Sequence, residues 1–233
     1  AGNVPEYARN AATEADYYNI TERISAGYLM NTLNLGRFST FIAGIRVESE
    51  NNDYATKYSP NVLSGFPSPQ GEIRDTSSTH QETNWLPNFQ LLLRPYDFMN
   101  VRLAAYRALA RPDFNRRLPS YILRAAGTFY DNNSITVGNP NLEDAKAWNY
   151  EVNTSFFSNY IGLFSISAFY KDITDAFHTV NGITLSAANG QDILDSLGIP
   201  VTNPFVTDFQ IQYQYNSTQP TKVWGLEVEH PAF

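Results

Sequence analysis

The chain has 233 residues, of which 42% are hydrophobic, 14% aromatic and only 17% charged. Its net charge of -7 argues against binding to the phosphate backbone of DNA or RNA. The absence of cysteine excludes zinc–thiolate sites, a redox-active thiol and a disulfide scaffold. Tyr and Phe number 15 each against 2 Met, a balance that favours strands over helices.

The start of the chain, Ala1-Gly2-Asn3-Val4-Pro5, is polar and lacks the basic residues and apolar core of a signal peptide. No stretch approaches the ~18 consecutive apolar residues that a membrane-spanning helix needs. We therefore expect the sequence to be a mature segment or a piece of a longer protein.

Alternation of apolar and polar residues with period two recurs along the chain and predicts strands with one apolar and one polar face. The clearest example is Phe209, Ile211, Tyr213 and Tyr215, which alternate with Gln and Asn. In chain order, the predicted strands cover residues 20–33, 41–47, 86–94, 100–108, 148–156, 161–172, 209–216 and 223–229.

The connections between these strands are of two kinds. Residues 34–37, 95–99 and 158–160 form tight turns, whereas 50–82, 110–146 and 174–208 are long and polar. Within the last, 189–198 has one apolar side and ends at a glycine, which predicts a short helix. Structureless loops beyond ~15 residues are uncommon in compact domains. Short turns alternating with long loops are instead typical of transmembrane β-barrels.

Alternation alone is compatible with two classes of fold. A soluble β-sandwich packs its apolar faces in a core, while a membrane barrel turns them to lipid. Small and charged residues on the polar faces, such as Gly44, Arg46 and Glu227, favour the barrel. So do aromatic residues near strand ends, which could form interfacial girdles: Tyr18, Tyr96, Phe98, Phe157, Tyr160 and Tyr170.

Residues that carry catalytic or metal chemistry do not form a recognisable pattern. His80, His178 and His230 are far apart and have no cysteine near them, so we predict no metal site. The acidic turns, including 131–133, lack the ligand spacing of a calcium loop. A nucleophile elbow, a phosphate loop and a dinucleotide fingerprint are all absent from the sequence. We interpret the carboxylate pairs 48/50 and 143/144 as chance occurrences, and we predict no cofactor, no catalytic residue and no enzymatic activity.

A series of short motifs gives the chain a resemblance to a known family. In order, they are GIRVE at 44–48, LPN at 86–88, RLAAYRALARPDF at 102–114, GNPNL at 138–142, the pair Asn149 and Glu151, FYKDI at 169–173, and GLE at 225–227. Taken together, they resemble the barrel portion of TonB-dependent outer-membrane receptors. The resemblance covers roughly residues 18–229.

This resemblance implies an all-β fold: an antiparallel, up-and-down transmembrane barrel of about 22 strands, plugged by a separate N-terminal domain. It also implies location in the bacterial outer membrane, where the barrel contacts lipid. Transport of a small-molecule ligand is driven by contact of the plug with TonB. This chain departs from the complete pattern, because it offers only about seven or eight strands. We therefore expect residues 1–233 to be a partial barrel domain without plug or TonB box, and the terminal Phe233 to be coincidental.

Six polar residues at strand positions are expected to face the lumen of such a barrel: Arg46, Glu48, Arg102, Asn149, Glu151 and Glu227. We interpret them chiefly as braces of the wall. Arg111-Pro112 should end a strand, since proline cannot donate a ladder hydrogen bond. The long loops are the expected sites of ligand capture, because binding residues concentrate in loops on a rigid scaffold.

Two functional hypotheses follow from the sequence. The first is a barrel segment of a TonB-dependent receptor that takes up a scarce nutrient such as a siderophore, a cobalamin or an oligosaccharide; the residues that bind the ligand are not identified. The alternative is a soluble, secreted β-sandwich that binds carbohydrate through exposed aromatic side chains.

Overall fold

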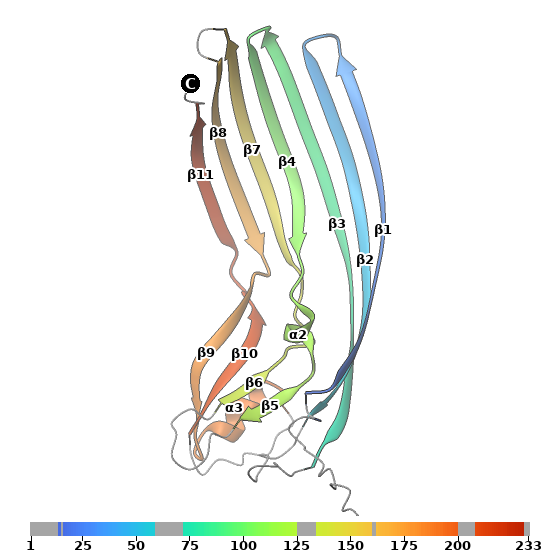
Figure 1. Cartoon of the computed structure of the whole chain (residues 1–233), viewed down its shortest axis with the longest axis vertical. Coiled ribbons are helices and arrows are strands. Elements are labelled where there is room, and N and C mark those ends of the chain that lie inside the picture. The colour runs from blue at the N-terminus through green and yellow to red at the C-terminus, as the bar shows by residue number, and fades with distance from the viewer. Residues whose placement is uncertain are drawn as a thin grey trace, which may run out of the picture.

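The computed structural model describes Glu14 and residues 16–58, 72–124, 134–159, 162–199 and 208–230. Strands dominate this part of the chain (Figure 1). The strands are β1 (Tyr18–Leu35), β2 (Ser39–Tyr58), β3 (Arg74–Tyr96), β4 (Met99–Ala110), β5 (Tyr121–Arg124), β6 (Ser134–Val137), β7 (Ala145–Ser158), β8 (Gly162–Thr174), β9 (Phe177–Leu185), β10 (Phe209–Asn216) and β11 (Thr221–Glu229). The helices are α2 (Phe114–Arg117) and α3 (Gly190–Ser196).

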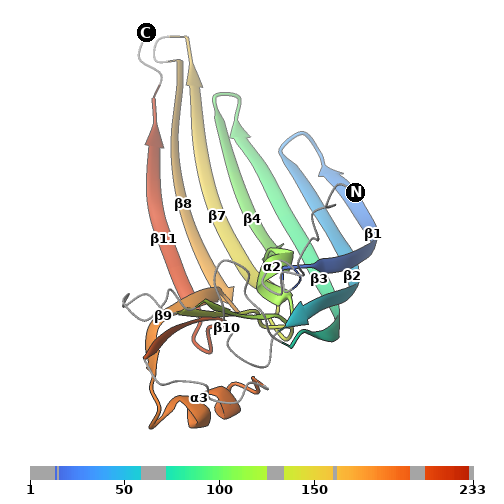
Figure 2. The ribbon, with the colours of Figure 1, turned by 60° about the horizontal axis from the view of Figure 1, so that its bottom comes forward.

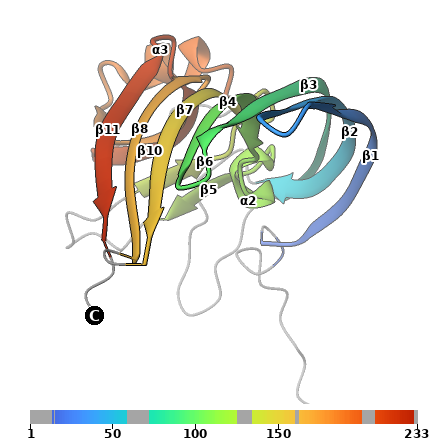
Figure 3. The same ribbon diagram turned by 90° about the horizontal axis from the view of Figure 1, so that it is seen from above.

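Seven strands form one antiparallel sheet in the order β1-β2-β3-β4-β7-β8-β11, which we call the wall. Tight turns connect β1 to β2 and β3 to β4 at one end of the wall, and β7 pairs with β8 as far as Ser158 and Gly162 at the same end (Figure 1). Seen from above, the wall is curved, with β1 and β11 as its two open edges (Figure 3). The fold is therefore an antiparallel, up-and-down partial barrel, as the sequence predicts.

Cross-strand register assigns the side chains to the two faces of the wall. Partners in an antiparallel pair point to the same side of the sheet. Phe41 pairs with Leu91, Leu91 with Leu103, and Leu103 with Val152, so one face carries apolar side chains across four strands. This face is bare: Leu29 on β1 is 75% exposed and Val228 on β11 is 68% exposed. A sandwich would cover both residues with a second sheet, so the sandwich hypothesis is wrong.

The bare face changes from apolar to polar along each long strand. On β2 the outward positions from 41 to 47 are apolar or alanine, and we call this level of the outer face the apolar band. Ser49, Asn51 and Asp53 continue the same face toward the loops. On β3, Trp85 pairs with Val47 at this boundary. At the turn end of the band, the rings of Tyr96 and Phe98 stack with centroids 5.3 Å apart.

The expected girdle residues do not all lie in these positions. Tyr96, Phe98 and Phe157 lie at the turn end, where the Phe157 N–H donates to the carbonyl of Phe98 over 2.8 Å. Tyr18 lies at the loop end instead, with its ring centroid 5.6 Å from that of Phe114 in α2. Tyr160 is outside the described residues.

A second sheet of four strands, in the order β5-β6-β10-β9, lies at the loop end of the wall (Figures 1 and 2). We call it, together with α3, the loop sheet. Its core consists of Ile135, Val137, Leu185, Leu194, Ile199, Phe209 and Ile211. The helix predicted over 189–198 is confirmed as α3, and Gly198 follows it with a φ of 66°.

The loop sheet shows that the prediction for residues 209–216 is wrong and that the long connections are partly structured. Residues 209–216, expected in the barrel, form β10 of the loop sheet, where the apolar side chain of Ile211 is fully buried against protein. Alternation looks the same whether the apolar face meets lipid or a protein core, which explains the error. The long polar connections also hold more structure than expected: β2 and β3 extend well beyond the apolar band, and the other two connections contain α2, β5, β6 and β9 besides the predicted α3.

The core of the loop sheet can be tested by deleting buried methyl groups. We expect Ile211→Ala to destabilise the loop sheet by about 2–5 kcal/mol, since the cavity cannot be filled by solvent. Hydrogen exchange of the β9 and β10 amides in the full-length protein measures this change. Gln212→Ala is the matched control, because the neighbouring Gln212 side chain is exposed. Equal protection in the two variants would contradict the assigned core.

Candidate functional site

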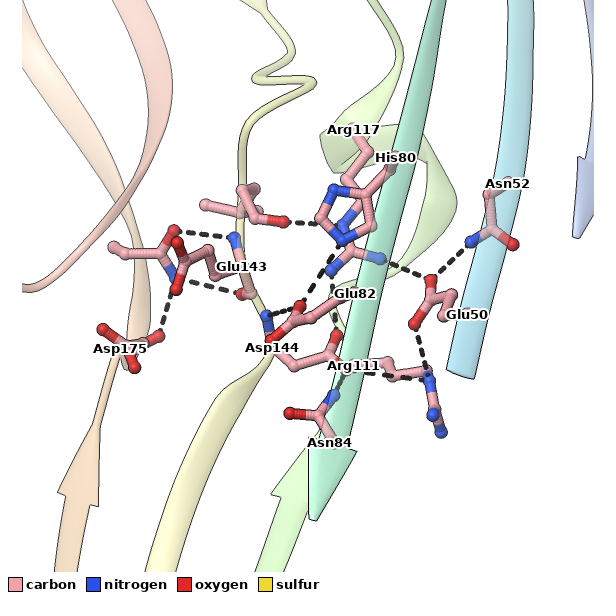
Figure 4. A network of polar contacts seen from close by, with 12 residues as sticks. Glu50, Asn52, His80, Glu82, Asn84, Arg111, Arg117, Glu143, Asp144 and Asp175 are labelled. Atoms are coloured by element: carbon pink, nitrogen blue, oxygen red, sulfur yellow. Dashed lines mark hydrogen bonds and ion pairs between the residues drawn. The ribbon is translucent and has the colours of Figure 1, made fainter. Parts of the chain in front are cut away.

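A cluster of charged side chains joins the inner face of the wall to the segments that lead into the loop sheet (Figure 4). We call it the junction network. It comprises Glu48, Glu50, Glu82, Arg111, Arg117, Asp144 and Lys146.

The strand period positions the acidic half of the network. Because alternate residues of β2 share a face, Glu48, Glu50 and Asn52 all point inward at the level where the loop sheet begins. All three are buried. The amide of Asn52 donates to one carboxylate oxygen of Glu50, which fixes the orientation of that carboxylate.

Arg117, at the end of α2, is the most deeply buried cation of the network, with 1% of its side chain exposed. Its Nη1 lies 2.7 Å from Glu50 Oε1, and its Nη2 lies 2.8 Å from Asp144 Oδ1. Its Nε donates to the carbonyl oxygen of Leu142 over 2.8 Å. A buried guanidinium is tolerated when its donors meet acceptors in this way. Arg117 thus ties β2 to the segment that precedes β7.

Arg111, which directly follows β4, shares Glu50 with Arg117 and also binds Glu48. Its Nη2 lies 2.5 Å from Glu48 Oε2, and its Nε lies 2.9 Å from Glu50 Oε2. Pro112 follows directly, and β4 ends at Ala110, as the Arg-Pro pair predicts. Burial alone would lower the pKa of Arg111, but hydrogen bonds to the two glutamates outweigh it and raise the pKa. The arginine therefore stays charged.

The carboxyl of Asp144 lies among buried charges of both signs. Burial raises the pKa of the Asp144 carboxyl, and the nearby carboxylates of Glu82 and Glu50 raise it further. The hydrogen bond from Arg117 acts in the opposite direction. For Arg117, burial alone would lower the pKa. Attraction by Glu50 and Asp144 outweighs burial and raises the pKa of Arg117 above its ordinary value. The buried acids and bases depend on one another.

The GNPNL motif shapes the segment that presents Asp144. The N–H of Asn139 donates to the carbonyl of Arg116 over 2.7 Å, and its side-chain amide donates to the carbonyl of Gln214 over 3.0 Å. A Cβ on Gly138 would lie 2.0 Å from the carbonyl oxygen of Leu118, so only glycine allows this approach. The motif therefore connects α2, β10 and the network.

The remaining ion pair of the network joins β3 to β7. The Nζ of Lys146 lies 2.6 Å from Glu82 Oε1, and the N–H of Asp144 donates to Glu82 Oε2 over 3.1 Å. His80, two residues before Glu82, is buried with its Nε2 3.4 Å from Glu82 Oε2. Within the described ranges, no three His, Cys, Asp or Glu side chains are grouped closely enough to hold a metal ion.

Nearer the turns, the curved inner face of the wall borders an open hollow of about 930 Å³. Both signs of charge line it, from Arg102 and Lys171 to Glu151 and Glu227. The hydroxyl of Tyr106 donates to Glu151 over 2.7 Å. The hollow offers polar and charged groups to whatever occupies the inside of the barrel.

The six residues expected to face the lumen are not all in one place: three line the hollow, Arg46 and Glu48 lie at the junction network, and Asn149 is in neither. Arg102, Glu151 and Glu227 line the hollow. Arg46 joins the junction network, with its Nε 2.5 Å from Glu48. Asn149 is buried, and its side-chain amide donates to the carbonyl of Ala147 over 3.2 Å. Their role in a closed barrel stays a prediction.

Sequence reasoning missed the residues that connect wall and loops. It treated Glu48/Glu50 and Glu143/Asp144 as chance pairs, although three of these four carboxylates bind the network arginines. One signal was available: Glu48 and Glu50 continue the inward face of the 41–47 strand. Their partners could not be read, because Arg117 lies 67 residues from Glu50 in the chain.

The network makes a prediction about local stability. Arg117→Met leaves Glu50 and Asp144 buried without their cation, and breaking such a pair costs about 3–5 kcal/mol. We expect faster hydrogen exchange throughout the loop sheet of the full-length protein. Arg23→Met is the control, since this side chain on β1 is 59% exposed and its ion pair with Asp53 lies outside the network and the loop sheet. Equal effects of the two substitutions would show that the network does not anchor the loop sheet.

The chain was also compared with known proteins. Among the described residues, no helix is long and apolar enough to cross a membrane. A search of curated proteins found no match. The hemophore receptor HasR of Serratia marcescens, as a double mutant in complex with its hemophore HasA and heme, matches with a TM-score of 0.60 and 11% identity. That match covers 89% of this chain and 31% of HasR.

Two further receptors are similar in fold. The ferric-catecholate import receptor Fiu of E. coli has a TM-score of 0.53 at 15% identity, covering 91% of this chain and 25% of Fiu. A mutant of the ferric enterobactin receptor PfeA of Pseudomonas aeruginosa has a TM-score of 0.51 at 14% identity, covering 91% and 33%. The chain thus spans about a third or less of these receptors.

The sequence also matches a family model described as TonB dependent receptor-like, beta-barrel, over residues 2–230. This match covers nearly the whole chain and agrees with the curved antiparallel wall. The chain therefore belongs to the TonB-dependent receptor β-barrel family, whose members are outer-membrane transport receptors of Gram-negative bacteria.

Proposed function

We propose that this chain forms part of the wall and outer loops of a receptor that captures a scarce nutrient at the outer membrane. The rest of the barrel closes against the edges β1 and β11. Uptake is energised through a plug domain of the same full-length protein and its contact with TonB. These partners are proposed on the basis of family membership.

One observation carries this proposal: the bare apolar face of a single-layer wall. Leu29, Ile45 and Val152 are exposed on a face that register makes continuous. Such a surface is unfavourable in water and favourable against hydrocarbon. The opposite face is polar, as expected for the inside of a transmembrane barrel.

For the ligand, we propose an iron chelate or heme. The structurally similar receptors are described as binding or importing heme through a hemophore, ferric catecholates and ferric enterobactin. The loop sheet is the part of this chain best placed to meet such a ligand, because it stands at the outer end of the wall (Figure 2). The junction network holds it in a fixed position there.

The membrane placement is tested by adding charge to the apolar band. We expect Ile45→Arg to impair assembly of the full-length protein, because Arg near the bilayer midplane costs ~2–4 kcal/mol. Ser49→Arg is the matched control: it lies on the same strand and the same face, beyond the band. Assembly is measured as the fraction of folded protein recovered from outer membranes. Normal assembly of both variants would contradict the assigned lipid face.

The ligand class is tested by uptake in cells that depend on the full-length protein. We expect these cells to need the receptor for growth on a ferric catecholate, a ferric hydroxamate or heme as the sole iron source. We expect them not to need it for uptake of cobalamin or oligosaccharides. Ile211→Ala should reduce this uptake while leaving the amount of assembled receptor unchanged. If the cells need the receptor only for uptake of cobalamin or oligosaccharide, the proposed ligand class is overturned but the receptor function is not.

A further inference from the structure

At the loop end of the wall, β3 has one free edge. Its pairing with β2 continues as far as Arg74, but its pairing with β4 reaches only Asn88. Beyond that point β4 pairs with β7 alone, as far as Ala110. Residues 74–87 of β3 therefore have a neighbouring strand on one side and, within the described part of the chain, none on the other.

Two features of the sequence open this edge. Pro87 stands directly before Asn88 and has no N–H to donate to a further strand. After β4, Arg111 reaches past β3 to bind Glu48 and Glu50 on β2. The chain that follows β4 is thus drawn to the inside of the wall and does not continue along β3.

Register shows which main-chain groups face the free edge. The N–H of Arg94 donates to the carbonyl of Phe38, the residue before β2, over 2.6 Å. Main-chain groups point alternately to the two sides of a strand, so even-numbered residues of β3 face β2 and odd-numbered ones face away. The β2–β3 register is unbroken along its length. The N–H and C=O of Thr79, Gln81 and Thr83 therefore point toward the free edge.

A groove of about 480 Å³ borders this edge, between β3 and the segment that precedes β7. We call it the β3 groove. Thr79, Gln81 and Thr83 line it from one side, and Pro140 and Asn141 from the other. A row of main-chain donors and acceptors beside a groove is the arrangement that binds an extended peptide by strand addition.

One buried side chain of the β3 groove lacks a partner. His80 lines the groove and is 8% exposed. Its Nε2 lies 3.4 Å from Glu82 Oε2 but makes no hydrogen bond within the described structure. Buried polar atoms nearly always have a partner, so this nitrogen points to an occupant that can form a hydrogen bond inside the groove.

The charges around the β3 groove favour a basic occupant. The Nζ of Lys146 is shared by three carboxylates, at 2.6 Å from Glu82, 3.7 Å from Glu143 and 3.9 Å from Asp175. Glu82 and Glu143 both line the groove, from opposite sides (Figure 4). Negative charge is therefore in excess there, and a Lys or Arg side chain of a bound peptide offsets it.

We propose that the β3 groove binds an extended, basic segment of a polypeptide ligand, which adds to β3 as an antiparallel strand. Ligand residues opposite Thr79, Gln81 and Thr83 exchange main-chain hydrogen bonds with them. Ligand residues opposite His80 and Glu82 point to the same side as these two side chains and carry Lys or Arg. The inference rests on the proposed function, since it requires that the loop end of the wall lies outside the cell. It adds a polypeptide-docking site that is separate from capture of the iron chelate or heme.

The experiment uses the full-length receptor purified in a non-ionic detergent and short synthetic peptides in which Thr alternates with Arg. We expect the Thr–Arg peptide to slow hydrogen exchange at the amides of Thr79, Gln81 and Thr83. N-methylation of its Thr amides should weaken binding by about 10-fold, because it removes the main-chain hydrogen bonds to β3. N-methylation of its Arg amides, which point away from β3, should leave binding unchanged.

A pair of variants tests the edge of β3 itself. Gln81→Pro deletes one N–H that faces the groove and keeps the pairing with β2, as Pro87 does on the same edge. We expect it to weaken binding of the Thr–Arg peptide by about 5-fold. Gln81→Ala is the matched control and should bind as the unmodified receptor does. If Gln81→Pro does not assemble, the two methylated peptides still decide the question.

Several results would overturn the proposal. One is that the Thr–Arg peptide does not slow exchange at the three amides, or binds no better than a Thr–Glu peptide. Another is that the two methylation patterns, or the two Gln81 variants, have equal effects. A third is slow exchange at the three amides before any peptide is added, because another part of the receptor then covers the groove. Iron uptake and the Ile45→Arg test do not use the β3 groove, so failure here is distinct from failure of the proposed function.

Discussion

The structure depends on one constraint: in hydrocarbon, each backbone N–H and C=O must find a partner within the protein. Between its two open edges, the wall meets this constraint with long antiparallel strands, such as the β2–β3 pairing from Ser39–Leu93 to Tyr58–Arg74. Because the backbone needs no water, the side chains of one face can be apolar and uncovered. The other face is then free to carry polar groups such as Arg102 and Glu151.

Beyond the apolar band the constraint changes, because water is present and charges can be used. There the wall holds its loops through paired charges rather than through a large apolar contact. Arg117 is satisfied by Glu50, Asp144 and a backbone carbonyl, and Arg111 by Glu48 and Glu50. Such pairs are costly to break and geometrically specific. This specificity suits a loop sheet that must stay in one place at the mouth of a barrel.

The two faces of the wall therefore use charge differently. Inside, Arg111, Arg117 and Lys146 of the junction network each bind a carboxylate, which fixes the arrangement of these side chains. Outside, the apolar band carries bare side chains such as Leu29, Ile45 and Val152. The same strands β4, β7 and β8 thus contribute both to the hollow within the barrel and to the surface toward lipid.

The strands of the wall could be predicted from the sequence, because alternation, tight turns and family motifs are local features. It also located the end of β4 at Arg111-Pro112 and the helix near Gly198. The place of 209–216 in the loop sheet could not be predicted without the three-dimensional fold, since an apolar face looks the same toward lipid and toward a core. It alone revealed the partners of Arg117, because Glu50 lies 67 residues away and only folding brings the two charges together.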